Sequence, residues 1–424
     1  MQFGIFYEHQ LPRPWGPGDE HRLLKEALEQ VALADRLGFH YAWEVEHHFL
    51  EEYSHSSAPE VFLAACSQLT SRIRLGHGIT LMAPNYNHPA RVAERIATLD
   101  LISDGRVEWG TGESSSRLEL EGFGIDPQKK RMAWHEAVRE TARMMVAEPY
   151  PGFDGEFFRM PHRNVVPKPL QKPHPPLWLA CSNRDTIKLA ARLGMGALTF
   201  AFVDPSEARF WVEEYHEIFA RECEPIGQDV NPRVAMVTGF SLHEDAQTAL
   251  DRGIEGFRFF SWALAHMYLS GSHVPGRFDL WEAFRKVEQP SAAPTGGIGD
   301  VAQVRATLEC FEDVGVDQVI FIQQAGNNRH EDICASMQLF AERLLPEVEA
   351  RHPAAANEKA TRLAPAIERA RAKIVPPVAM SEVEPVDAYP VMVEKLGAQA
   401  RTGGAGERLR TVAEGAGAKP PPDD

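Results

Sequence analysis

The stretch ALADRLGFHYAWEV (residues 32–45) decides the fold, because it joins a helical pattern to a strand pattern through one glycine. Apolar residues at helical spacing lead up to Gly38, and a mainly apolar run follows it. Glycine commonly ends a helix because it adopts the left-handed conformation without steric cost. The stretch therefore predicts a helix that ends at Gly38 and a buried strand directly after it.

The same unit recurs twice further along the chain. KLAARLGMGALTFAF (residues 188–202) repeats it around Gly194, and CFEDVGVDQVIFIQ (residues 310–323) repeats it around Gly315. Continuous apolar strands that alternate with helices are typical of a parallel sheet covered by helices. The recurrence therefore predicts an α/β fold.

Eight strand patterns can be counted along the chain, with amphipathic helices at residues 21–37, 89–103 and 131–147 between some of them. The strand patterns lie at residues 3–7, 40–45, 73–81, 106–110, 176–181, 196–201, 233–241 and 318–323. Eight strands with crossover helices predict a (β/α)8 TIM barrel with insertion segments. A doubly wound open sheet is the alternative, but no Gly-x-Gly-x-x-Gly follows the first strand, which weakens a Rossmann assignment.

Two long intervals and a change of composition suggest how the chain is divided. Residues 1–350 are expected to form the barrel domain, and its aromatic-rich interval 242–300 is expected to form an insertion or lid. The tail at 351–424 is rich in Ala, Pro and Glu, which predicts a partly helical (356–374) or disordered segment.

The composition excludes several classes of protein. A formal net charge of −16 argues against a general nucleic-acid binder, because phosphate binding needs a basic surface. The five cysteines are far apart in the sequence and odd in number, so a disulfide framework is not expected. The N-terminus lacks the pattern of a signal peptide, and no apolar run reaches the length of a membrane span. We therefore expect a cytoplasmic protein without membrane or nucleic-acid partners.

Glu46, His47 and His48 directly follow the second predicted strand. Barrel enzymes build their sites at the carboxyl ends of the strands, so these side chains are expected at the barrel mouth. A solvated loop is one interpretation. A metal site is a weaker one, because adjacent side chains diverge on an extended backbone and no ligand motif accompanies them. Acid–base or anion-stabilising chemistry by His47 suits a histidine that titrates near neutral pH.

Ser182, Asn183, Asp185 and Thr186 follow the fifth predicted strand, where a helix begins. Hydroxyl groups and free backbone N–H groups at a helix start can hold an anion. Ordinary N-capping explains the same residues equally well. The local sequence leaves both interpretations open.

Several of these segments together resemble the bacterial luciferase-like flavin-dependent monooxygenases. The segments occur in the family's order over about residues 1–348 and read MQFGIF (1–6), YAWEVEHHF (41–49), GHGITLMAP (76–84), NHPARVAERIATLDLISDGRVEWGTG (87–112), LACSNRDTIKLAARLGMGAL (179–198) and GIGDVAQVRATLECFEDVGVDQVIFI (297–322). The resemblance implies a TIM barrel, often dimeric, that binds reduced FMN (FMNH2) at its mouth and uses O2 to oxygenate a partly apolar organic molecule through a peroxyflavin. It also implies a separate flavin reductase, and no nicotinamide fingerprint is visible in the chain. Relatives that use the deazaflavin F420 for hydride transfer make F420 the alternative cofactor, and a non-catalytic flavin-binding subunit is a further alternative.

The resemblance also assigns residues. His47 matches a position implicated in acid–base chemistry beside the flavin, with His48 as a possible orienting residue. Ser182, Asn183 and Thr186 match the region that holds the flavin phosphate, and Thr80 lies on the strand that passes the flavin ring. A mobile lid is implied late in the chain, where Phe257, Phe259, Phe260, Trp262, Met267, Tyr268 and Trp281 would exclude water.

Two positions depart from bacterial luciferase. Gly112 stands where that enzyme has a reactive cysteine, and Glu113 stands where it has an arginine that helps to hold phosphate. A carboxylate cannot replace that arginine as an anion partner, so Arg184 or Arg117 is expected to compensate. These departures argue against light emission as the role of this protein.

Overall fold

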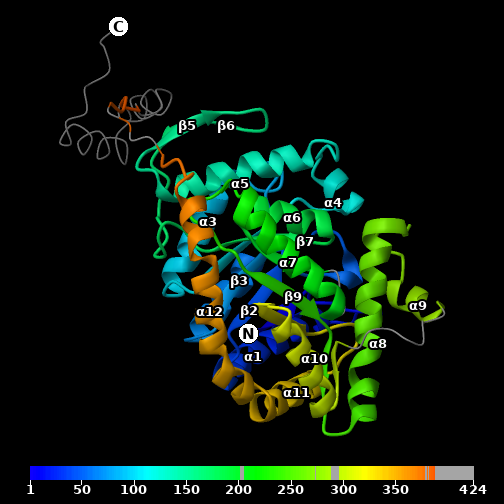
Figure 1. Cartoon of the computed structure of the whole chain (residues 1–424). Helices are drawn as coiled ribbons and strands as arrows, with labels where there is room; N and C mark the ends of the chain where they lie inside the picture. Colours follow the sequence, from blue (N-terminus) through cyan, green and yellow to red (C-terminus); the bar gives the residue numbers. More distant parts are fainter. Residues whose placement is uncertain (201–204, 273, 288–295, 378–379, 381, 387–424) are drawn as a thin grey trace, which may run out of the picture. The chain divides into compact units, whose positions relative to one another are not determined.

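Eight parallel strands close into a barrel in this computed structural model, which confirms the predicted TIM-like fold (Figure 1). Neighbouring strands around the barrel follow the order β1-β12-β9-β8-β7-β4-β3-β2. Their bounds are Gln2–Tyr7 (β1), Tyr41–Val45 (β2), Arg74–Leu81 (β3), Val107–Gly112 (β4), Leu177–Cys181 (β7), Gly196–Thr199 (β8), Val234–Thr238 (β9) and Gln318–Ile322 (β12). The structure describes residues 1–200, 205–272, 274–287, 296–377, 380 and 382–386.

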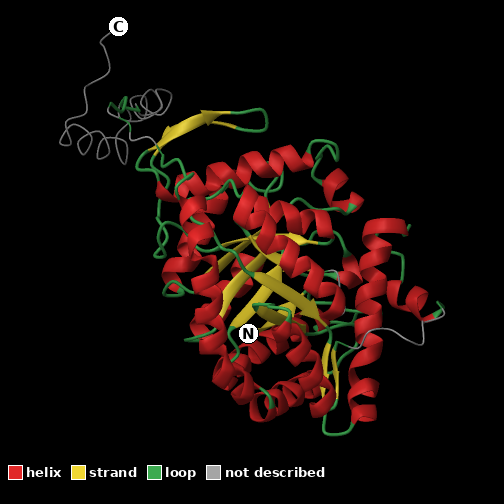
Figure 2. Ribbon diagram, in the orientation of Figure 1, coloured by secondary structure: helices red, strands yellow, loops and turns green. Residues whose placement is uncertain are grey.

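Helices surround the barrel strands (Figure 2). They are α1 (Asp19–Leu37), α2 (Pro59–Leu69), α3 (Pro89–Ile102), α4 (Arg117–Gly122), α5 (Lys130–Val146), α6 (Arg184–Arg192), α7 (Pro205–Glu222), α8 (Ala246–Ala265), α9 (Leu280–Arg285), α10 (Val301–Asp313), α11 (His330–Arg343) and α12 (Leu345–Arg371). Among the helices that the structure describes, none has the length and apolarity needed to cross a membrane.

The three recurrent glycines end helices as the sequence predicts. Gly38 has φ 95° and donates its N–H to the carbonyl of Ala34 in the last turn of α1. Gly194 and Gly315 are also left-handed, with φ 70° and 84°. A side chain at such a φ is strained, so each glycine permits the tight reversal from helix to strand.

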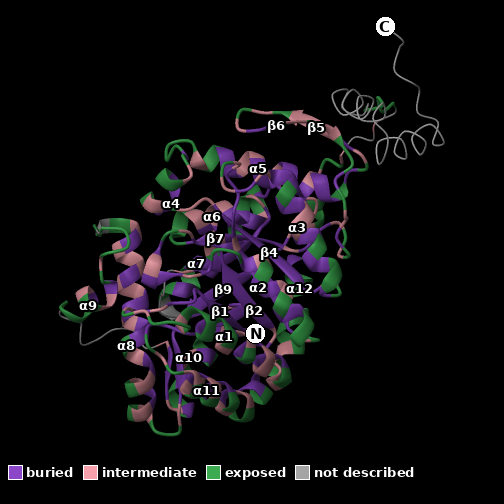
Figure 3. Ribbon diagram, turned by 180° about the vertical axis from the view of Figure 1, so that it is seen from behind, coloured by how far each residue is buried: buried purple, intermediate pink, exposed green. Residues whose placement is uncertain are grey.

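Side chains of the strands alternate between the barrel interior and the helix layer. On β2, Trp43 faces the interior, where its ring meets the edge of Trp178 with centroids 5.4 Å apart, whereas Ala42 packs in the outer core. The outer core fills the space between strands and helices (Figure 3). Both faces of the strands are thus buried, which explains their continuous apolar runs.

Two features of the strands differ from the expectations. The predicted strand at 233–241 divides into β9 and a separate β10 (Phe240–Leu242), which pairs with β11 (Gly297–Gly299). Gly239 lies at the break, where a Cβ would come within 2.7 Å of the Phe257 ring of α8, so a residue without a side chain fits there. An antiparallel hairpin of β5 (Tyr150–Asp154) and β6 (Arg159–Arg163) extends away from the barrel and had no strong sequence signal (Figure 1).

The boundary expected at residue 350 falls inside α12. This helix covers most of the expected helical region 356–374, begins earlier at Leu345 and ends at Arg371, and Leu345, Val348 and Leu363 are buried along it. Lys359 on α12 also forms an ion pair with Asp317 at 2.5 Å. The compact unit therefore runs from Met1 to Ala379, and the second unit, Met380–Asp424, lies largely outside the described residues.

The expected lid region forms helices. Residues 246–285 contain α8, a π-helical segment η2 (His266–Ser270) and α9, while residues 273 and 288–295 lie outside the described part. Phe260 of α8 packs against Phe6 of β1 and Tyr53 of the short helix η1 (Glu51–Tyr53), with ring centroids 6.5 and 5.6 Å apart. The lid thus adds its aromatic residues to the core inside the barrel.

Candidate active site

His47 lies in the first turn of chain after β2 and is nearly completely buried, with 5% of its surface exposed. Two backbone hydrogen bonds hold this turn. The N–H of Glu46 donates to the carbonyl of Ile79 on β3 at 3.0 Å, and the N–H of His47 donates to the carbonyl of Ser56 at 2.8 Å. The position is the one expected at the carboxyl end of the second strand, but the solvated-loop interpretation does not fit this burial.

Two carboxylates flank the imidazole of His47. Its Nδ1 lies 3.0 Å from Oε1 of Glu119 on α4, and its Nε2 lies 3.5 Å from Oε2 of Glu8, the residue that follows β1. Both carboxylates have further donors, since the Tyr53 hydroxyl donates to Glu8 at 3.1 Å and the Ser114 hydroxyl donates to Glu119 at 2.5 Å. These bonds orient both carboxylates around a single ring.

The carboxylates determine the charge of His47. Burial by itself would lower its pKa, but the negative charges of Glu8 and Glu119 and the hydrogen bond to Glu119 outweigh burial and raise the pKa to about 10. The pKa of Glu119 is lowered, because His47 and the hydrogen bonds from Ser114 and the His48 N–H outweigh its own burial. His47 is therefore an imidazolium at neutral pH, which holds a proton and does not act as a free base.

Tyr268 adds the segment after α8 to this group. Its hydroxyl lies 3.1 Å from Nδ1 and 3.2 Å from Nε2 of His47, and it belongs to the π-helical segment η2. Burial, and then the nearby Glu119, raise the pKa of Tyr268 well above 10, so the phenol stays neutral. π-helical turns are rare and often occur at functional sites.

His48 points away from this group. Its Nε2 lies 3.2 Å from Oε1 of Glu46, and its ring packs against Phe123 and Tyr86. Only its backbone reaches the cluster, where the N–H donates to Glu119 at 2.9 Å. Among the described contacts, the orienting partners of His47 are therefore Glu8, Glu119 and Tyr268. Glu8 directly follows the first predicted strand, which is a weak signal for a place at the barrel mouth, whereas no sequence pattern indicates Glu119.

The expected phosphate-binding residues lie together at the start of α6. Asn183 accepts the N–H of Thr186 at 3.1 Å, and the Thr186 hydroxyl accepts the N–H of Asn183 at 3.3 Å, which is a capping box. Ser182 is exposed directly before this cap. The N-capping interpretation is confirmed, and the remaining N–H groups of the first turn and the Ser182 hydroxyl are donors that fit an anion.

Gly112 and Thr80 lie on neighbouring strands but face different layers. A Cβ on Gly112 would come within 2.6 Å of Cγ2 of Ile79 and 4.0 Å of Cβ of Ala180, so the residue lies against the mouth ends of β3 and β7. Thr80 instead hydrogen-bonds to Nδ1 of His77 at 2.6 Å, in a small cavity lined by residues of α2 and α3. Its side chain thus faces the helix layer, while Ile79 packs against the inner core.

The cations near this end pair with carboxylates, among them the two that were expected to compensate for Glu113. Arg184 pairs with Glu214 at 2.6 Å, and the side chain of Arg117, 86% exposed, pairs with Glu121. Arg131 of α5 donates from Nε to Glu113 at 2.7 Å. Burial raises the pKa of the Cys181 thiol, directly before Ser182, to about 12, and the positive charge of Arg131 opposes this rise. The run Lys129-Lys130-Arg131, with no acidic residue in the first turn of α5, was the overlooked signal.

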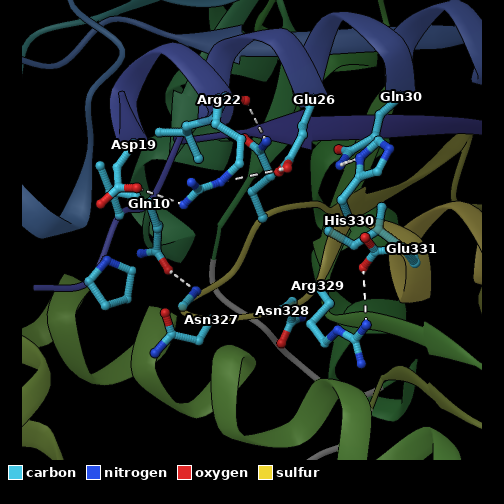
Figure 4. Close-up of a pocket in the computed structure, with 16 residues that line it drawn as sticks. Gln10, Asp19, Arg22, Glu26, Gln30, Asn327, Asn328, Arg329, His330 and Glu331 are labelled. Carbon is cyan, nitrogen blue, oxygen red and sulfur yellow. Dashed lines mark hydrogen bonds and ion pairs between the residues drawn. The ribbon is translucent and has the colours of Figure 1, made fainter. Parts of the chain in front are cut away.

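A separate cavity of about 270 Å³ lies outside the barrel, between α1 and the loop that precedes α11 (Figure 4). Its charged side chains are matched to one another. Arg22 pairs with Asp19 at 2.8 Å and with Glu26 at 3.8 Å, and Arg329 pairs with Glu331 at 3.4 Å. The His47 group does not line this cavity.

Comparison with known proteins places the chain among oxygenases. The family model described as luciferase-like monooxygenase matches residues 1–318. The oxygenase component of the flavin-dependent trigonelline monooxygenase of Acinetobacter baylyi is 26% identical over 356 residues, which cover 82% of this chain and 95% of that protein.

Two solved structures are similar to the whole barrel. Monooxygenase RslO1 from Streptomyces bottropensis has a TM-score of 0.66 and 29% identity, over 82% of this chain and 100% of that one. An F420-dependent secondary alcohol dehydrogenase has a TM-score of 0.63 and 21% identity, over 81% and 98%, and shows a shared fold alone. By name, the similar proteins therefore include a flavin-dependent oxygenase component and an F420-dependent dehydrogenase. The chain belongs to the luciferase-like monooxygenase family.

Proposed function

We propose that this protein is the oxygenase component of a two-component, FMN-dependent monooxygenase. It takes reduced FMN from a separate reductase and uses O2 to oxygenate a partly apolar organic molecule. The observation that carries the proposal is the buried imidazolium of His47, held between Glu8 and Glu119 beneath Tyr268 of the lid. The trigonelline monooxygenase relative, an oxygenase component by name, supports the separate reductase.

The donors at one end of the barrel mouth fit the phosphate of FMN. Ser182 and the first N–H groups of α6 would bind the phosphate oxygens, with Asn183 and Thr186 holding the helix start. Arg131 would supply the positive charge that Glu113 lacks. When FMN binds, the Arg131 side chain would leave Glu113 and contact the phosphate instead. Gly112 would leave the mouth end of β4 without a side chain. Bound reduced FMN supplies the electrons that the reaction with O2 requires.

The protein's own residues would control protons and water. His47 holds a proton at both ring nitrogens at neutral pH, so it would act as a proton donor or stabilise developing negative charge. Tyr268 would relay or orient that proton through its hydroxyl. Phe257 and Phe260 of α8 are buried over the barrel core and would exclude water from the reacting groups.

The proposal includes a homodimer. Four large apolar side chains are exposed on the adjacent helices α2 and α3, at Val61, Leu69, Leu101 and Ile102. An apolar face of this kind commonly marks an interface between copies. Sedimentation of the wild type and of Leu69→Glu measures the association: a dimer that the variant weakens supports this part, and a wild-type monomer contradicts it.

Anaerobic titration with reduced FMN, followed by mixing with O2 and a panel of organic substrates, tests the function. Saturable binding of reduced FMN and O2-dependent product formation are expected. Tight binding of F420 with hydride transfer and no reaction of reduced FMN would assign the alternative cofactor. Flavin binding with no product across the panel, but activation of a partner subunit, would indicate a non-catalytic flavin-binding role.

A further inference from the structure

The buried group beneath the lid contains more negative than positive charge. Glu8 and Glu119 are 2% and 0% exposed, and His47 is the single cation between them. The remaining contacts of the two carboxylates come from the hydroxyls of Tyr53 and Ser114 and from the N–H of His48. Within the described part of the chain, no lysine or arginine pairs with either carboxylate. Two carboxylates therefore face one imidazolium.

One oxygen of Glu8 is left without a hydrogen bond. Its Oε1 accepts from the Tyr53 hydroxyl, whereas its Oε2 has no hydrogen-bond partner among the described residues. The nearest cation is Nε2 of His47 at 3.5 Å, which is beyond good hydrogen-bond geometry. A buried carboxylate oxygen normally has a partner, so this oxygen points to a ligand that brings positive charge.

Aromatic rings gather around the same group. Tyr53 has its ring centroid 5.6 Å from Phe260, 6.3 Å from Tyr268 and 6.0 Å from the His47 ring. Phe6 adds a fourth ring at 6.5 Å from Phe260. The faces of aromatic rings attract cations, and quaternary ammonium groups are commonly bound by such rings beside a carboxylate.

The cavity beside α1 has a different balance of charge. In the cavity beside α1, each arginine already has a carboxylate partner, so its charged side chains do not need a ligand (Figure 4). Beneath the lid, the unmatched carboxylate and the rings would repel an anionic substrate and attract a cationic one.

We propose that the substrate that binds at the barrel mouth carries a positive charge beside its apolar portion. The charged group is a quaternary ammonium, an N-alkylpyridinium or a protonated amine. Glu8 is the residue that selects this charge. The inference rests on the proposed function in placing the substrate at the barrel mouth, and it names the substrate class that the proposed function leaves open.

Three probes of nearly the same shape test the proposal by equilibrium binding, without turnover. They are choline, its neutral carbon isostere 3,3-dimethylbutan-1-ol and the anion 3,3-dimethylbutanoate, titrated calorimetrically into the protein with and without oxidised FMN. We expect choline to bind at least about tenfold more tightly than the neutral isostere, and the anion to bind most weakly. Equal affinity for choline and the neutral isostere, or preference for the anion, overturns the proposal, and these wild-type measurements do not depend on any variant.

Glu8→Gln tests the assigned residue, because it keeps the shape and the Tyr53 hydrogen bond but removes the charge. Its preference for choline over the neutral isostere should fall to within about twofold. The control is Glu51→Gln on η1, whose carboxylate pairs with Arg13 at 2.9 Å and should leave the preference unchanged. A preference that survives in Glu8→Gln contradicts the role of Glu8.

The two proposals can fail separately. A cation preference in a protein that oxygenates no substrate with reduced FMN would contradict the proposed function alone. Oxygenation that depends on reduced FMN, in a protein with no preference for cationic probes, would overturn the charge inference alone.

Discussion

Nδ1 of His47 lies 3.0 Å from Oε1 of Glu119, although 72 positions separate the two residues in the chain. The contact joins the turn after β2 to the short helix α4 that follows β4. With Glu8 on the other side of the ring, it converts a histidine of ordinary pKa into a buried cation. The chemistry proposed for this protein depends on that cation.

Replacing His47 by Gln should abolish most product formation and leave the affinity for FMN within a few-fold of the wild type. The variant keeps a hydrogen-bonding side chain beside Glu119 but cannot hold the positive charge or donate the proton. A loss of about 10²- to 10⁴-fold in kcat is expected for a group that transfers a proton in the reaction. Activity that survives within a few-fold would remove His47 from the chemistry.

The charge on His47 should appear in the pH dependence of stability. Its pKa rises from 6.5 in the unfolded chain to about 10 in the folded protein. This contribution to stability is fully present below about pH 6.5 and is lost as the pH rises toward 10. The free energy of unfolding of the wild type should therefore fall relative to that of His47→Gln by up to about 1.4 kcal/mol per pH unit in this window. Urea unfolding of both proteins at several pH values measures this difference in the free energy of unfolding. A difference that does not vary with pH contradicts a positively charged His47.

Tyr268→Phe should affect the chemistry without affecting the flavin. The variant keeps the aromatic packing of the lid against Tyr53 but loses the hydroxyl beside His47. We expect unchanged FMN affinity, a lower kcat and a changed pH profile of kcat. NMR of the His47 ring nitrogens provides a second readout, which should shift in the variant. An unchanged imidazole spectrum together with an unchanged kcat would show that the contact has no role.

Arg131→Gln should weaken the binding of FMN by about tenfold and leave the binding of riboflavin unchanged, because only FMN carries the phosphate. Arg117→Gln is the matched control, since this side chain is 86% exposed and pairs with Glu121. Fluorescence titration with both flavins measures the effect. Ser182→Ala should show the same selectivity more weakly, whereas Thr186→Ala would also remove half of the capping box of α6. Equal losses for FMN and riboflavin would exclude Arg131 from the phosphate site.

Gly112→Ala should destabilise the fold by about 1–3 kcal/mol, because the new Cβ would lie 2.6 Å from Cγ2 of Ile79. Ile79→Ala removes that methyl group, so the double variant should lose less stability than the sum of the two single variants. Additive losses in urea unfolding would indicate that the two side chains do not meet.

The barrel could be predicted from the sequence because its signals are local. The glycine after each helical stripe and the apolar run behind it lie within about fifteen residues, and Gly38, Gly194 and Gly315 each adopt the predicted conformation. The placement of His47 at the mouth followed from the same logic. Strand β10 could not be separated from β9 by its sequence, because both are apolar, and the separation is visible only in the pairing of β10 with the distant β11.

The partners of His47 could not be predicted in the same way. Glu119 lies in a polar segment without periodicity, and Tyr268 reaches the ring from an insertion 221 positions away. The compensating cation was expected at Arg184 or Arg117, and Arg131, which lies beside Glu113, was not considered. Such contacts depend on how the loops at the strand ends meet in space, which sequence spacing does not encode.

The most direct test of the account is anaerobic binding of reduced FMN, followed by rapid mixing with O2. We predict saturable binding of reduced FMN. After mixing with O2, the rate at which the bound flavin is oxidised should differ between the wild type and His47→Gln. Oxygenated product should form only with the wild type. Identical flavin oxidation with and without protein, or tight F420 binding with no effect on the reaction of reduced FMN with O2, would contradict the account.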